Sequence, residues 1–139
     1  MNVIAGSDPS NFLRLSLRAN AFFSTFSGAS FLLARNEIAA LLGEIPALAV
    51  FSVGLQLLLF AGALLWLASR PEISIPLTMG VIVADGLWVV GTGVVVYAGL
   101  FARGGEILAL VLADVVLVLA VLQMIGVRRI ARVEAQAHS

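Results

Sequence analysis

The chain has 139 residues, of which 61% are hydrophobic before its 13 glycines are counted and only 12% are charged. An average soluble domain is about 45–50% apolar with glycine included and about 25% charged, and a small chain needs a large polar surface in water. The composition therefore excludes a soluble globular protein and predicts that lipid surrounds most of the molecule.

Charge and residue types exclude several functions. The formal net charge is zero, which argues against nucleic acid as a partner. The chain has no cysteine and one histidine, His138, so we expect no disulfide, thiolate or imidazole metal site and no cofactor. Nucleotide-binding, GxSxG and HExxH motifs are absent, and no catalytic nucleophile or base can be named. The sequence does not predict an enzyme.

The first membrane span is predicted over residues 12–34. Ser7, Asp8 and Ser10 are candidate N-caps, and Pro9 suits a first helical turn. The uncharged part of this segment is short, so it reaches spanning length only if Arg14 and Arg18 are included.

At about 100° per residue, the first segment has three faces. One is apolar (Leu15, Phe22, Phe26, Leu33), one carries Arg14, Arg18, Thr25 and Gly28, and a third stripe carries Asn20, Ser24 and Ser27. We interpret the segment as a span whose polar side faces the other helices. The alternative is an amphipathic helix lying in the membrane interface.

Three further spans are predicted over residues 46–69, 76–100 and 106–127. Each is long enough to cross the hydrocarbon as a helix, and lipid cannot satisfy the backbone of open strands. The connections, at Arg35–Glu44, Arg70–Ser74 and Arg103–Glu106, are short, and short loops join antiparallel neighbours. The sequence thus predicts an all-α, up-down-up-down four-helix bundle: one transmembrane domain over residues 1–139 with a cytoplasmic tail over 128–139.

Polar residues inside the predicted spans form an inner centre. A charge at mid-bilayer costs about 2.5–3.5 kcal/mol, so it usually faces the bundle interior. At 1.5 Å rise per residue, Arg18, Asn20 and Asp85 fall about 8–14 Å from the cytoplasmic border, and Trp88 and Thr92 share the stripe of Asp85. Two interpretations stay open. Arg18 and Asp85 form a structural ion pair, or Asp85 is a protonatable acid that lines a route for a substrate or for protons.

Gln56 and Asp114 form an outer polar level. Asp114 has no arginine at its depth, so we expect it to be protonated or hydrogen-bonded to Gln56, either as glue between helices or as a proton site. Gln123 lies nine residues after Asp114 and thus on the opposite helix face. If Asp114 faces the interior, Gln123 faces lipid or a second subunit.

Short motifs carry a family resemblance. Arg18-Ala19-Asn20-Ala21-Phe22-Phe23-Ser24, then Ser27-Gly28, and the later Asp85-x-x-Trp88-x-x-Gly91 resemble small bacterial four-helix integral membrane proteins. The resemblance implies the architecture and no activity. Small multidrug transporters are similar in size, but they carry an essential acid in their first helix, where this chain has Arg14 and Arg18.

Two classes of function follow from these features. The first is an accessory or structural subunit, or an assembly partner of other membrane proteins. The alternative is a proton-coupled small-molecule transporter or channel that acts as an oligomer through Asp85 or Asp114. In both cases the expected partners are the lipid bilayer and other membrane subunits or further copies of the chain.

Arginines near span ends predict the orientation. Arg14, Arg18, Arg70, Arg128, Arg129 and Arg132 fall on one side and Arg35 and Arg103 on the other. Positive residues are retained on the cytoplasmic side, so both termini should be cytoplasmic in a bacterial inner membrane.

Reporter fusions after His138 and within Arg35–Glu44 should therefore report opposite sides. A periplasmic reporter signal at the C-terminus would reject this topology.

Overall fold

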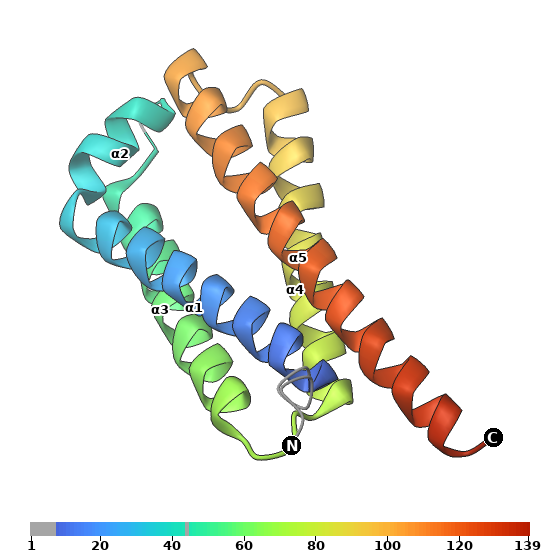
Figure 1. The fold of residues 1–139 in the computed structure, drawn as a ribbon. Helices are drawn as coiled ribbons and strands as arrows, with labels where there is room; N and C mark the ends of the chain where they lie inside the picture. Colours follow the sequence, from blue (N-terminus) through green and yellow to red (C-terminus); the bar gives the residue numbers. More distant parts are fainter. Residues whose placement is uncertain (1–7, 44) are drawn as a thin grey trace.

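The computed structural model describes residues 8–43 and 45–139, and every regular element in these ranges is an α-helix (Figure 1). The candidate N-cap Ser7 and the loop residue Glu44 lie outside the described residues. The helices are α1 (Pro9–Leu33), α2 (Arg35–Leu42), α3 (Ala47–Ser69), α4 (Ile75–Tyr97) and α5 (Arg103–Ala137).

The long helices form two antiparallel pairs. α1 lies beside α3, and α4 lies beside α5 (Figure 1). α1 also packs against α5, whereas α3 and α4 barely touch. The start of α1, the end of α3, the start of α4 and the end of α5 lie at one end of the molecule, and α2 lies at the other (Figure 1). The two pairs are thus joined mainly through α1 and α5.

The helix starts follow the sequence signals. Asp8 is the N-cap of α1, and its carboxylate accepts the backbone N–H of Ser10 at 2.9 Å. This bond holds the pKa of Asp8 below its ordinary value, because it stabilises the charged form. At α4 the hydroxyl of Ser74 accepts the backbone N–H of Leu77 at 3.3 Å. In both helices a proline occupies the first turn, where no N–H is needed.

The expected loop over Arg35–Glu44 is wrong in part, because α2 occupies most of it. α2 ends at Gly43, which has φ 113° and so adopts the left-handed conformation that glycine tolerates. The adjacent start of α5 packs closely on α2, and the backbone N–H of Ala102 donates to Leu42 O at 2.9 Å. A Cβ on Gly105 would lie 2.6 Å from Leu42 Cα, so this glycine permits a close helix contact. The connection expected over Arg103–Glu106 is wrong, because α5 already begins at Arg103.

The tail expected over residues 128–139 is largely a continuation of α5. α5 has 35 residues and remains helical to Ala137. Its first part lies beside α4, and its last turns project beyond the other helices (Figure 1).

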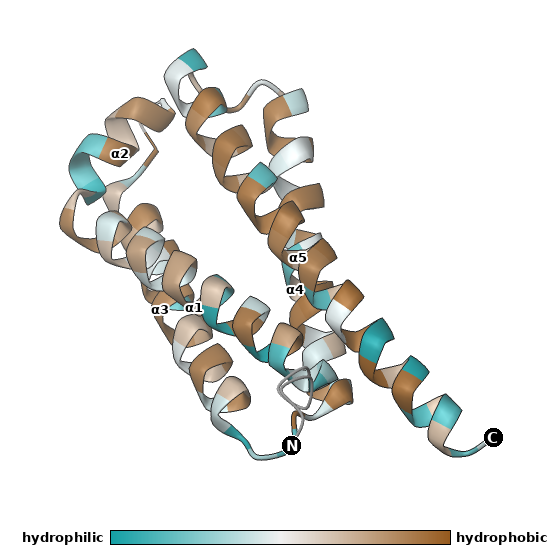
Figure 2. Cartoon of the chain, in the orientation of Figure 1, coloured by the Kyte–Doolittle hydropathy of each residue, from teal (hydrophilic) through white to brown (hydrophobic). Residues whose placement is uncertain are grey.

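In the part of the chain that the structure describes, three helices are long and apolar enough to cross a membrane: α3, α4 and α5. Figure 2 shows their largely hydrophobic surfaces, with hydrophilic residues gathered on α2 and on the last turns of α5. The molecule is therefore a multi-pass membrane protein by the composition of its helices. The side chains expected on the apolar side of α1 are all well exposed (Leu15, Phe22, Phe26, Leu33).

Glycine sets the closest helix crossings. A Cβ on Gly28 of α1 would lie 2.8 Å from Gly54 O of α3, and a Cβ on Gly126 of α5 would lie 2.9 Å from Leu13 Cβ of α1. The other glycines of α3 and α4 have no atom within 4 Å of such a Cβ (Gly62, Gly80, Gly86, Gly91, Gly93). Gly54 thus marks a close helix contact, whereas these five glycines do not within the described chain.

The guanidinium of Arg14 connects the start of α1 to the end of α3. It donates to Ala68 O, to Arg70 O at 2.8 Å and to Pro71 O at 3.4 Å. These carbonyls end α3, where the helix leaves acceptors without partners and carries partial negative charge. Arg14 therefore caps a neighbouring helix, a contact that sequence spacing did not indicate.

The crossing of α1 and α3 predicts a difference between two glycines of the same helix. Gly54→Ala should lower the free energy of unfolding by about 1–3 kcal/mol, because the new methyl group overpacks against Phe31 Cβ at 2.8 Å and Gly28 O at 2.9 Å. Gly62→Ala, which meets no atom within 4 Å, is the matched control and should be neutral or stabilising. Thermal unfolding in detergent measures both. Equal effects would contradict the close approach at Gly54.

Candidate functional site

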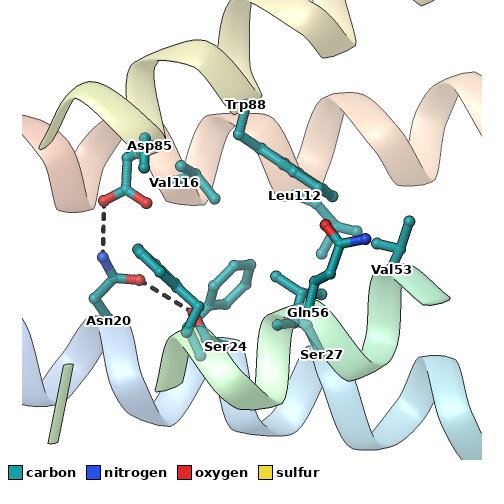
Figure 3. A pocket seen from close by; sticks show the side chains of 13 residues that line it. Asn20, Ser24, Ser27, Val53, Gln56, Asp85, Trp88, Leu112 and Val116 are labelled. Carbon is teal, nitrogen blue, oxygen red and sulfur yellow. Dashed lines mark hydrogen bonds between the residues drawn. The ribbon is translucent and has the colours of Figure 1, made fainter. Parts of the chain in front are cut away.

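Asp85 of α4 is the centre of a buried polar cluster. Its side chain is only 4% exposed. Its Oδ2 accepts a hydrogen bond from Asn20 Nδ2 of α1 at 2.8 Å and a longer one from Gln123 Nε2 of α5 at 3.5 Å. The Ser24 hydroxyl donates to Asn20 Oδ1 at 3.3 Å, which orients the amide so that its NH₂ faces Asp85 (Figure 3). Three helices thus meet at one carboxyl group.

The partners of this carboxyl are neutral. Within residues 8–43 and 45–139, Asp85 forms no ion pair, and both of its hydrogen-bond donors are amides. A buried carboxylate is costly unless a positive charge or a proton compensates it. The cluster can therefore hold a proton on Asp85 or accept a cation that comes from outside the chain.

The carboxyl lies in the wall of a cavity of about 240 Å³, which we call the polar cavity. Figure 3 shows Asp85 and Asn20 at one end of it and Gln56 at the other, with Trp88 on the α4 side. Both amide donors bond Oδ2, and the other oxygen of Asp85 points into the space (Figure 3). The lining is Asn20, Phe23, Ser24, Ser27, Val53, Gln56, Leu57, Phe60, Ala84, Asp85, Trp88, Leu112 and Val116.

A second cavity of about 390 Å³, the apolar cavity, adjoins the first. The two share Val53, Trp88 and Leu112 in their linings, so Trp88 stands between them. The remaining lining is almost entirely apolar. Thr92 carries its one polar side chain, and the Thr92 hydroxyl donates to Trp88 O of its own helix at 2.8 Å.

Arg18, the expected partner of Asp85, is exposed. Asn20 takes its place. The two residues are two positions apart, which is about 200° around a helix, so only one of them can face the interior. Depth alone placed both beside Asp85, and the stripe of Asn20, Ser24 and Ser27 was the better guide, because all three are buried.

The outer polar level does not form a pair. Asp114 is exposed on α5, whereas Gln56 lines the polar cavity. The structure of the described residues contains no hydrogen bond between Gln56 and Asp114. Leu112 and Val116 face that cavity, and Asp114 lies about 200° from each around the helix.

Gln123 faces the interior, because the inward position of Asp114, on which its expected outward direction depended, is not observed. It is fully buried and bonds Asp85, whereas Asp114 faces outward. The nine-residue spacing correctly required opposite faces, but it did not say which residue was inside. Gln123 Oε1 is also buried and accepts no hydrogen bond within the described chain.

No metal site is formed in the described ranges, since no three histidine or acidic side chains come together there. No family model matches the sequence, and neither a curated protein nor a solved structure matches it. The interpretation of the site therefore depends on its own geometry.

The Asn20–Asp85 bond can be tested by a double-mutant cycle. Asn20→Ala and Asp85→Ala should each lower the free energy of unfolding by about 1.5–3 kcal/mol, because the bond involves an ionisable group. The double variant should lose less than the sum, since the partners are in contact. Arg18→Ala is the control and should change stability by no more than about 0.5 kcal/mol. Additive losses for Asn20→Ala and Asp85→Ala, together with a large loss for Arg18→Ala, would instead support an ion pair between Arg18 and Asp85.

Proposed function

We propose that the protein is a membrane carrier for small molecules in which Asp85 exchanges a proton for the ligand. The observation that carries the proposal is a buried carboxyl, bonded only to amides, in the wall of a cavity between two helix pairs. Ionisable residues inside membrane spans commonly mark proton or substrate pathways.

The surrounding amides suit a group that changes its protonation state. Amide NH₂ groups donate to a carboxylate, and amide oxygens accept from a protonated acid. Gln123 has an unpartnered, buried Oε1, so a half-turn of its amide would let it bond either form of Asp85. The cluster therefore stabilises the carboxylate without fixing it as an ion pair would.

The arrangement of the pairs also supports a carrier. The α1–α3 and α4–α5 pairs approach closely at Leu13 and Gly126 near one end and, through α2, at Leu42 and Gly105 near the other. The cavities lie where the two pairs face each other. Small rigid-body motions of one bundle half against the other are the usual means of alternating access around a central site.

In this proposal α1 is the fourth span, and the fold is the up-down-up-down bundle. Its 25 residues extend about 37 Å, enough to cross the hydrocarbon. The exposed Arg18 lies close enough to the border to extend its charge towards the headgroups. Three arginine–aromatic contacts at helix ends suit membrane borders: Arg35 over Phe51, Arg70 over Trp66 and Arg129 over Phe12, at 5.8, 5.0 and 4.3 Å. With Arg14, Arg18, Arg70 and the arginines of the α5 tail at one end, both termini would be cytoplasmic.

Protonation of Asp85 is testable without a known ligand. Infrared difference spectra of the protein in lipid, recorded across a pH range, should contain a protonated-carboxyl band at low pH that disappears as pH rises. Asp85→Asn should remove this band, and Asp114→Asn, on the outward face of α5, should retain it. A band that survives in Asp85→Asn would reject Asp85 as the proton site.

A second candidate, an accessory subunit, is favoured by the outward face of α4 and α5. Asp114 is exposed within a predicted span, where lipid gives a carboxyl no partner. Of the α4 residues only Thr78 and Asp85 are buried, and its glycines leave room for another helix.

If the protein is an accessory subunit, purification from native membranes in mild detergent should yield a stoichiometric partner. The Asp114→Leu variant should no longer retain that partner. Recovery of the chain alone would reject this candidate.

A further inference from the structure

We infer that the polar and apolar cavities form one binding site for a lipophilic ammonium ion, an organic cation with a single amine and an apolar body. The inference rests on the proposed carrier function and names its substrate class. It follows from the charge, the aromatic rings and the shape that the two linings present.

The polar cavity has the chemistry of an ammonium site. One oxygen of Asp85 accepts both amides, and the other faces the cavity, where an N–H⁺ group could donate to it (Figure 3). Phe23, Phe60 and Trp88 line the same space. Aromatic faces attract cations by about 0.5–2 kcal/mol each, more where water is excluded. A carboxylate among aromatic rings thus selects a positive, weakly hydrated head group.

The linings also argue against other ligand charges. No arginine is among the described residues of either cavity, so a carboxylate or phosphate ligand would find no cation there. Asp85 would repel such an anion directly. A small metal ion is equally disfavoured, because Asp85 is the only carboxylate among the described lining residues and hard cations require several oxygen ligands.

The apolar cavity accounts for the rest of the ligand. Its volume, about 390 Å³, lies in the range of small-molecule pockets. The Thr92 hydroxyl already donates within its own helix, so the indole N–H of Trp88, where the two cavities meet, is the remaining side-chain donor among the described lining residues. An aliphatic or aromatic body would fill it from Trp88 towards Phe31, Phe101 and Leu108.

The exchange balances in charge. A protonated Asp85 releases its proton to water when the cation binds, and the new N–H⁺···O⁻ bond replaces the O–H bond. No covalent bond to the ligand forms or breaks, and no electron is transferred. One proton should therefore leave the protein for each cation bound.

Trp88 provides the readout. The chain has two tryptophans, and Trp66 is 53% exposed and lines neither cavity. In a Trp66→Phe background, Trp88 is the only indole, and it contacts both cavities. Titration of the purified protein in detergent with phenylbutylammonium should change its emission saturably. Phenylbutanol, the neutral analogue, should bind at least about tenfold more weakly.

Two variants in the same background test the assignment. Asp85→Asn should raise the Kd for phenylbutylammonium at least about tenfold and leave the Kd for phenylbutanol unchanged. Ala109→Phe, which fills the apolar cavity, should weaken both ligands alike. Circular dichroism establishes that each variant is folded. If Asp85→Asn does not fold, Ala109→Phe still tests whether the ligands occupy the apolar cavity. Equal affinities for amine and alcohol in the parent, or no effect of Ala109→Phe, would overturn the inference.

The two proposals fail in different ways. If Asp85 titrates in the infrared spectra but the amine binds no better than the alcohol, the substrate class is wrong and the carrier proposal stands. If no carboxyl band depends on Asp85, the proton exchange itself is wrong, whatever the fluorescence titration shows.

Discussion

A carboxyl group buried in a membrane protein needs polar partners from the chain, because lipid offers none. Asp85 takes its partners from α1 and α5, through Asn20 and Gln123. The Asn20 bond joins the α1–α3 pair to the α4–α5 pair, whereas the Gln123 bond lies within the second pair. Contact between α3 and α4 themselves is small. Thr78 and Asp85 are the only fully buried residues of α4, so this polar cluster contributes to its position together with partly buried apolar residues such as Ile75 and Val81.

The two halves of the molecule are held by different means. α1 and α3 cross with backbone nearly in contact at Gly28 and Gly54, and the apolar cluster of Leu13, Leu17 and Leu64 fills the space between them towards one end. The described part of α4 has no such crossing, and its glycines meet open space. The first pair is thus tightly packed, whereas the second borders two cavities on one side and has open space beside its glycines.

The sequence predicted the class of fold well, because length and hydropathy alone determine whether a helix can cross a membrane. It also drew attention to Asn20, Asp85, Trp88 and Gln56, since polar residues in apolar segments are conspicuous, and the structure places these four residues in the lining of one cavity. It did not predict the pairing. Arg18 and Asn20 lie at similar depths, and only the rotation of α1, set by the glycine crossing with α3, decides which faces Asp85. Likewise, the rotation of α5 about its axis decides that Gln123 is buried and Asp114 is exposed. The contact of Gly126 with Leu13 sets this rotation. Helix α2 was missed because eight residues give too short a pattern to separate a helix from a loop.

The unbroken length of α5 has a mechanical consequence. One helix of 35 residues carries Leu112 and Val116 at the cavity wall, Gln123 at the polar cluster and the basic turns at its end. Such a helix is about 52 Å long, well beyond the roughly 30 Å of hydrocarbon. It acts as a rigid lever, because no described residue breaks it between the cavity and Ala137. A tilt of about 10° near its first turn would move its far end by roughly 9 Å. Any displacement of α5 at Gln123 would therefore also displace its arginine-bearing end.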